Sequence, residues 1–173
     1  NADLANDLGN LLNRTVAMII KYHGGVVKNA KVNGAVDNDL IQLAEKTVAD
    51  YTAQMDRMEL TTAAKTVWAL IGKANKYIDE TAPWALAKDE SKKEELQTVM
   101  YNLAETLRLV AIMAEPFIPN AAPKIFQQLG LGNRELRLAD AVWGGLADGT
   151  KVEKGDPLYP RITVDEDGNT IIG

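Results

Sequence analysis

The sequence contains no cysteine, a single histidine and only two phenylalanines among its 173 residues. Without cysteine, the chain has no disulfide framework, no thiolate metal site and no thiol nucleophile. No apolar run approaches the roughly 20 residues that a membrane span needs, and no signal-peptide pattern begins the chain. These absences favour a cytoplasmic protein with no membrane partner.

Charge narrows the class of partner further. The formal net charge is −5 at pH 7. Non-specific binding to DNA, to RNA or to an acidic membrane requires a broad basic surface, which an acidic chain is not expected to have. A small site that reads a few exposed RNA bases is still allowed, because stacking and edge hydrogen bonds need only a local arginine or lysine.

Apolar residues recur at spacings of three and four along most of the chain, which predicts amphipathic helices. The expected helices cover residues 1–23, 37–58, a stretch from a cap at Thr61 or Thr62 to the turn before Pro83, 92–115 and 121–129. A short helical turn is expected at 84–88, and Trp68 is expected in the core. Short links between antiparallel neighbours predict an all-α, up-and-down helix bundle.

The composition of the sequence changes after residue 130, where glycines and the turn-forming dipeptide Asp-Gly become frequent. We expect residues 1–130 to form the bundle and residues 131–173 to form a C-terminal extension packed on it. Residues 158–164 and 170–172 are predicted to be short strands of a hairpin around Asp167-Gly168. The extension is too small to support a hydrophobic core of its own.

A catalytic site is hard to assemble from these residues. His23 stands at a predicted helix end beside two glycines, which favours a C-terminal cap that complements the helix dipole over a catalytic role. The chain has no glycine-rich phosphate loop, and the acidic turn at 165–168 lacks the ligand spacing of a calcium loop. The chain alone is therefore predicted to be non-catalytic.

The stretch around Pro83 interrupts the helical pattern. Pro83 disfavours helical backbone angles at Ala82, so the chain must turn there. Trp84 then lies in the first turn of the next element. A tryptophan at such a corner is either a wedge between helices or a flat surface for a ligand, and the general tendency of aromatics to be buried favours the wedge.

Asn10 and Arg14 stand one helical turn apart on the polar face of the first helix. An amide beside a guanidinium can donate and accept along a nucleobase edge, and the guanidinium can also pair with a phosphate. The alternative is that Arg14 merely pairs with a surface carboxylate such as Asp7.

Several of these stretches resemble one family, the anticodon-binding domain of bacterial methionyl-tRNA synthetase, a class I aminoacyl-tRNA synthetase. The resembling stretches are Asn1-Ala2-Asp3-Leu4, Leu8-Gly9-Asn10-Leu11-Leu12-Asn13-Arg14, Asn75-Lys76-Tyr77-Ile78, Ala82-Pro83-Trp84 and residues 155–162, with Tyr159 where phenylalanine is common. The helix end at 115–119 is less specific, because several class I synthetases share it.

The resemblance implies a helix bundle that reads the CAU anticodon of methionine tRNA. It implies that Trp84 stacks on the first anticodon base, and that Asn10 and Arg14 supply polar contacts to the anticodon. Asn75, Tyr77 and Pro83 are expected in a supporting role. In that role a helix-end Asn75 and a half-buried Tyr77 hold the turn that aims Trp84.

The resemblance further implies a parent methionine–tRNA ligase whose catalytic domain is absent from this sequence. ATP, with zinc or magnesium, would serve that domain, and this chain would hold no cofactor. The expected partners are the anticodon loop of methionine tRNA and the parent's catalytic domain. A first residue that lies directly inside a helical pattern agrees with an excised fragment.

Two alternatives stay open at this point. One is a helical protein-interaction bundle in which Trp84 is an interhelix wedge, and the other is the equivalent domain of another class I synthetase, such as the cysteinyl enzyme. The combination of Asn10, Arg14 and Trp84 speaks against the second. A stacking role requires Trp84 to be partly exposed and close to Asn10 and Arg14.

Overall fold

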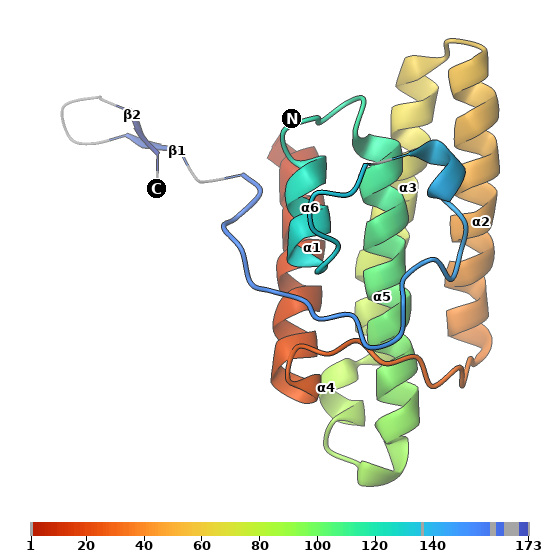
Figure 1. The fold of residues 1–173 in the computed structure, drawn as a ribbon, viewed down its shortest axis with the longest axis vertical. Helices are drawn as coiled ribbons and strands as arrows, with labels where there is room; N and C mark the ends of the chain where they lie inside the picture. Colours follow the sequence, from red (N-terminus) through yellow and green to blue (C-terminus); the bar gives the residue numbers. More distant parts are fainter. Residues whose placement is uncertain (1, 136, 160–161, 165–169, 173) are drawn as a thin grey trace.

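The computed structural model describes residues 2–135, 137–159, 162–164 and 170–172, with the side chains of residues 6–135 and 137–159. The elements are α1 (Ala2–His23), α2 (Ala35–Asp56), α3 (Leu60–Thr81), α4 (Pro83–Leu86), η1 (Glu90–Lys92), α5 (Lys93–Ala114), α6 (Ala122–Gln128), η2 (Leu138–Asp140), β1 (Ile162–Val164) and β2 (Thr170–Ile172). The predicted all-α bundle is confirmed, and the described strands form one short hairpin (Figure 1). None of the described helices is both long and apolar enough to cross a membrane.

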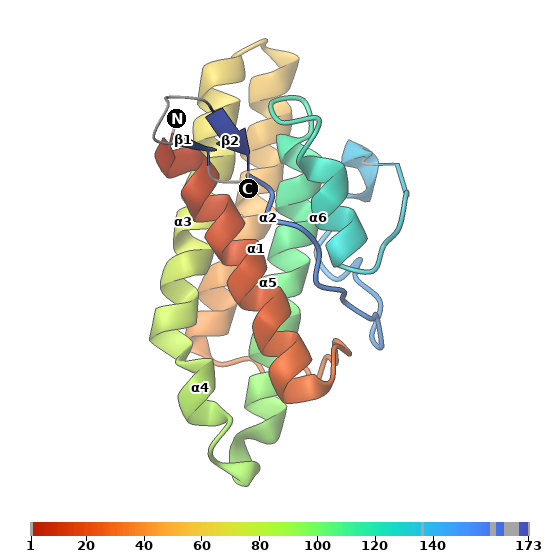
Figure 2. The same ribbon diagram turned by 90° about the vertical axis from the view of Figure 1, so that its left-hand side faces the viewer.

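The long helices alternate in direction along the chain, but α1 does not pack beside its sequence neighbour. Figures 1 and 2 show α1 and α3 running in one direction and α2 and α5 in the other. Helix α1 packs against α3 and α5, and α2 packs against the same two helices from the other side. Helices α1 and α3 are therefore parallel neighbours, which the 11-residue connection at 24–34 makes possible.

Helix ends follow local backbone chemistry. Helix α1 ends at two glycines with positive φ, Gly24 at 61° and Gly25 at 84°, and their N–H groups bond back to the carbonyls of Ile20 and Ile19. Such glycines are common just after a helix because they adopt this conformation without strain. The predicted cap of α3 is wrong: the helix begins at Leu60 with Glu59 as its cap, so both threonines lie within its first turn.

Helix α5 is buried on all sides from Thr98 to its end. Every residue from Thr98 to Ala114 is buried, including Asn102, Glu105 and Arg108. Its polar residues are buried as well, because residues 140–146 of the C-terminal extension cover the face that Glu105 and Arg108 occupy. Helices α1, α2, α3 and α6 pack on the rest of α5.

A buried carboxylate fastens the extension to α5. The side chain of Glu105 is fully buried and accepts hydrogen bonds from the backbone N–H groups of Gly144, Gly145 and Leu146 at 2.8, 2.9 and 3.0 Å. Arg108 pairs with the same carboxylate at 2.7 Å. Both carboxylate oxygens are thus satisfied, which a buried charge requires.

Arg108 holds the preceding part of the extension. Its guanidinium donates to the backbone oxygens of Asp140 and Val142 at 2.8 and 2.6 Å. A β-carbon at Gly145 would lie 2.5 Å from Nη2 of Arg108, so only glycine fits there. The Glu105–Arg108 pair therefore attaches residues 140–146 in addition to the apolar contacts of the buried Ala141 and Leu146.

The rest of the described extension follows the bundle surface. Val27 exchanges backbone hydrogen bonds with residues 149 and 150, and the N–H of Val152 bonds to the carbonyl of Gly25 at 2.8 Å. Strands β1 and β2 pair antiparallel, with Ile162 opposite Ile172. The first strand begins later than predicted, and Leu158 is buried in the core instead. The turn expected at 165–168 lies outside the described residues.

Two single-residue expectations need correction. Trp68 is only partly buried at the margin of the core. His23 is the last residue of α1, and its Nε2 atom is buried with no hydrogen-bond partner in the described part of the chain. Burial lowers the pKa of His23, as do the positive charges of Lys28 and Lys93. The imidazole is therefore neutral at pH 7, and the expected complement to the helix dipole is wrong.

Substitution of Glu105 by glutamine leaves the buried Arg108 charge without its counter-ion. We expect the free energy of unfolding, measured by urea denaturation, to fall by about 3–5 kcal/mol. Lys46→Ala, which removes the exposed Lys46–Asp50 ion pair, is the matched control and should change stability by less than about 0.5 kcal/mol. Equal effects of the two substitutions would contradict the role assigned to Glu105.

The lowered pKa of His23 makes stability depend on pH. The unfolded chain binds a proton near the ordinary pKa of 6.5, whereas the folded chain binds it only at lower pH. The contribution of neutral His23 to the free energy of unfolding is fully present above pH 6.5 and is lost as the pH falls through the pKa of His23 in the folded chain. Urea denaturation at pH 7, 6 and 5 should show a smaller loss of stability in His23→Gln than in the unsubstituted protein.

Candidate functional site

The turn between α3 and α4 rests on one residue. Ala82 has φ 44° and ψ 64°, its N–H bonds to the carbonyl of Ile78 at 3.0 Å, and its carbonyl accepts from Ala85 at 2.8 Å. It thus ends one helix and starts the next, and buried Pro83 occupies the first position of α4. The left-handed conformation costs a non-glycine residue roughly 1–2 kcal/mol. The turn predicted at Ala82-Pro83 is confirmed.

Trp84 is presented to solvent at this turn. Its exposed fraction is 45%, whereas Leu86, two residues further on, packs against the core. The two side chains therefore lie on different sides of the short helix. A tryptophan with nearly half of its surface exposed is not a wedge buried between helices, and the exposed part is accessible to a ligand.

Arg14 of α1 lies against α3. Its Nη2 atom pairs with the Asp79 carboxylate at 3.1 Å, and the side chains of Arg14 and Asp79 are 41% and 67% exposed. The alternative interpretation, in which Arg14 pairs with a surface carboxylate, is therefore confirmed in this structure, although the partner is Asp79, five positions before Trp84, and not Asp7. Asn10, also exposed, lies one turn before Arg14 on α1.

Asn75 ties the same two helices together. Its Nδ2 atom donates to the backbone oxygen of Asp7 at 3.1 Å and to that of Ile71 at 3.3 Å. The residue is not at the helix end, as predicted, but lies within α3, which continues to Thr81. It therefore fixes α1 on α3 rather than holding the turn itself.

Tyr77 is fully buried, so the expected half-buried position is wrong. Its hydroxyl donates to the carboxylate of Asp37 near the start of α2, and Nδ2 of Asn102 on α5 donates to the same hydroxyl at 3.2 Å. The other carboxylate oxygen of Asp37 accepts from the N–H of Gly34 at 2.7 Å. Burial, followed by the bond to Asp37, raises the pKa of Tyr77 far above its usual value. The hydroxyl joins three helices and stays protonated.

The structure thus brings Arg14 and Asn75 to the contact between α1 and α3, and α4, which carries Trp84, follows α3 directly (Figure 2). Asn10 stands on α1 between Asp7 and Arg14, the two residues of α1 that bond to α3. Sequence reasoning missed Asp79 because no pattern within α1 or α3 alone shows which residues of the two helices meet. A search of the described residues finds no group of three or more acidic or histidine side chains placed to hold a metal ion.

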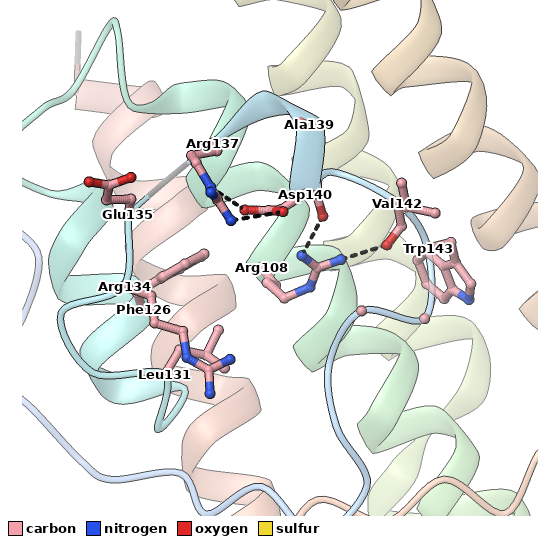
Figure 3. Close-up of a pocket in the computed structure, with 12 residues that line it drawn as sticks. Arg108, Phe126, Leu131, Arg134, Glu135, Arg137, Ala139, Asp140, Val142 and Trp143 are labelled. Atoms are coloured by element: carbon pink, nitrogen blue, oxygen red, sulfur yellow. Dashed lines mark hydrogen bonds and ion pairs between the residues drawn. The ribbon is translucent and has the colours of Figure 1, made fainter.

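A cavity lies elsewhere, between α5, α6 and the extension. It measures about 750 Å³ and is lined by residues that include Arg134, Trp143 and Arg108 (Figure 3). The guanidinium of Arg108 is committed to Glu105 and to backbone carbonyls. The cavity therefore belongs to the attachment of the extension and is separate from the contact between α1 and α3.

Comparison with known proteins identifies the family. A sequence model described as the anticodon binding domain of methionyl tRNA ligase matches residues 27–170. Methionine–tRNA ligase of Bacillus subtilis is 52% identical over 172 residues, which cover 96% of this chain and 26% of the relative. The enzyme of Clostridium perfringens is 48% identical, with 96% of this chain and 26% of the relative covered. The chain thus spans about a quarter of the length of these curated relatives.

Solved structures agree with the sequence relatives. The apo form of Mycobacterium tuberculosis methionyl-tRNA synthetase superposes with a TM-score of 0.86 at 30% identity, over 95% of this chain and 34% of that one. The same synthetase in complex with methionyl-adenylate superposes with a TM-score of 0.84 at 31% identity, over 93% of this chain and 32% of that one. The resemblance seen in the sequence is confirmed: the chain belongs to the family of anticodon-binding domains of methionyl-tRNA ligases.

Proposed function

We propose that this chain reads the CAU anticodon of methionine tRNA on the surface formed by α1, α3 and α4. The observation that carries the proposal is the exposed indole of Trp84, which a strained residue and a proline hold immediately after the helix that contacts Arg14. A preformed flat surface can stack on an unpaired base without an ordering cost at binding.

The roles of the three contact residues follow from their chemistry. Trp84 stacks on the first anticodon base, cytosine, and a stack of this kind stabilises a complex by about 1–3 kcal/mol. The exposed Asn10 amide can both donate to and accept from a base edge, and Arg14 adds a partly exposed guanidinium. Pro83, Tyr77 and Asn75 support this surface through the buried turn, the three-helix junction and the contact between α1 and α3.

The negative net charge determines which parts of the RNA can contribute to affinity. With a net charge of −5, the chain attracts the phosphate backbone poorly, so affinity depends on contacts to a few bases. The RNA partner is therefore a loop with splayed bases and not a duplex, whose bases are stacked and inaccessible.

The proposal assigns the chemistry to the rest of the parent ligase, a cytoplasmic enzyme. Its catalytic domain would use ATP, with zinc or magnesium, to attach methionine to the tRNA that this chain selects. The proposal also divides the chain into a recognition bundle of residues 1–130 and a C-terminal extension of residues 131–173. The bonds from Glu105 and Arg108 to residues 140–146 support the packing of this extension on the bundle.

Substitution of Trp84 by alanine should remove the stacking surface. We expect the Kd for an RNA stem-loop with a CAU anticodon to rise between about fivefold and 150-fold, measured by fluorescence anisotropy. Trp143→Ala, which removes a partly exposed tryptophan of the extension, is the matched control and should leave the Kd within about twofold. Equal binding of CAU and UAU loops by the unsubstituted protein would refute the proposed function.

Arg14→Gln separates base contacts from phosphate contacts. If Arg14 contacts a base edge, the substitution should reduce the preference for CAU over altered loops while the dependence of log Kd on log salt keeps its slope. Loss of a phosphate contact would instead lower that slope by about 1 and weaken the binding of all loops by the same factor. Lys21→Ala, at an exposed position near the end of α1, serves as the control for a general loss of positive charge.

A further inference from the structure

The side-chain amide of Asn75 has its orientation fixed by two backbone carbonyls. The oxygens of Asp7 on α1 and Ile71 on α3 lie 3.1 and 3.3 Å from Nδ2. An asparagine amide has two hydrogens on nitrogen and none on oxygen. Only the NH2 group can face two carbonyl oxygens, so the opposite orientation of the amide is excluded.

The fixed nitrogen determines what the oxygen can do. Both hydrogens of the NH2 group have acceptors, and Oδ1 must point away from the two carbonyls. Within residues 6–135 and 137–159, no donor hydrogen-bonds to this oxygen, and Asn75 is partly exposed. The result is a hydrogen-bond acceptor that is held in place and free for a ligand.

The acceptor lies within the surface that the proposed function gives to the anticodon. Asn75 contacts α1 at Asp7, and Asp79, one turn further along α3, contacts α1 at Arg14. Asn10 is on α1 between these two contact points, one turn from each. Asn75 is therefore flanked by the residues to which the proposal assigns polar contacts with the bases.

A lone acceptor distinguishes bases by their exocyclic groups. Cytosine and adenine carry amino groups that donate, whereas uracil and guanine carry a carbonyl oxygen at the corresponding position. A carbonyl placed against Oδ1 would leave two acceptors facing one another, and an unpaired polar group at a contact lowers affinity.

We propose that Oδ1 of Asn75 accepts a hydrogen bond from the exocyclic amino group of one of the two amino-bearing anticodon bases, cytosine or adenine. Asn75 is then a specificity-determining residue as well as a link between α1 and α3. This inference rests on the proposed function, because it requires the anticodon to occupy the surface of α1, α3 and α4.

A double-mutant cycle between protein and RNA tests the contact. The 173-residue chain is titrated with three stem-loops: unmodified CAU, one with pyrimidin-2-one in place of cytosine, and one with purine in place of adenine. The two modified bases lack only the amino group. We expect one modification to weaken binding to the unsubstituted protein by about fivefold to tenfold, which is the size of one hydrogen bond.

In Asn75→Ala the same modification should have no effect, because the acceptor is gone. If Asn75 has only a structural role, Asn75→Ala should raise the Kd of all three loops by the same factor. The modification would then still weaken binding to the variant, and this additive result would overturn the inference. The measurement on the unsubstituted protein does not depend on how the variant folds: the inference is also overturned if neither modification changes its Kd. Absence of binding to any loop would instead refute the proposed function itself.

Discussion

The burial of α5 on every side is the constraint on which the rest of the structure depends. A helix surrounded by protein must satisfy each polar group that it brings inside. Asn102 bonds to the Tyr77 hydroxyl, and Glu105 and Arg108 bond to one another and to the backbone of the extension. The same three residues therefore join α5 to α3 on one side and to residues 140–146 on the other.

This central helix also determines where the proposed recognition surface lies. Because α1 and α3 both pack on α5, they lie side by side and parallel, although the chain connects α1 to α2. The parallel contact brings Arg14 to Asp79 and Asp7 to Asn75. Helix α3 ends at the strained Ala82, so Trp84 emerges a few residues after the Asp79 contact. The packing on α5 thus fixes the order of these polar contacts along α1 and α3, and Trp84 lies in the helix that follows α3.

The sequence predicts elements better than contacts between them. The ends of α1, α5 and α6 and the turn at Ala82-Pro83 follow from local signals, because glycine, proline and apolar spacing act within a few residues. Nothing within α5 itself shows that Glu105 and Arg108 are buried beneath the extension. The Arg14–Asp79 ion pair and the hydrogen bond from Asn75 to Asp7 were not predicted for the same reason, because both depend on how two segments that are distant in the sequence pack together. The identity of the anticodon residues came from family resemblance, and their contacts with RNA stay a prediction.

The most direct test of the central claim is an NMR titration that follows all three tryptophans of the chain in one experiment. Each indole N–H gives its own signal in a ¹⁵N-edited NMR spectrum of the labelled chain. On titration with a CAU stem-loop, the account predicts that the Trp84 signal shifts or broadens while those of Trp68 and Trp143 keep their positions. A spectrum in which Trp84 stays unchanged at saturating RNA would contradict the account.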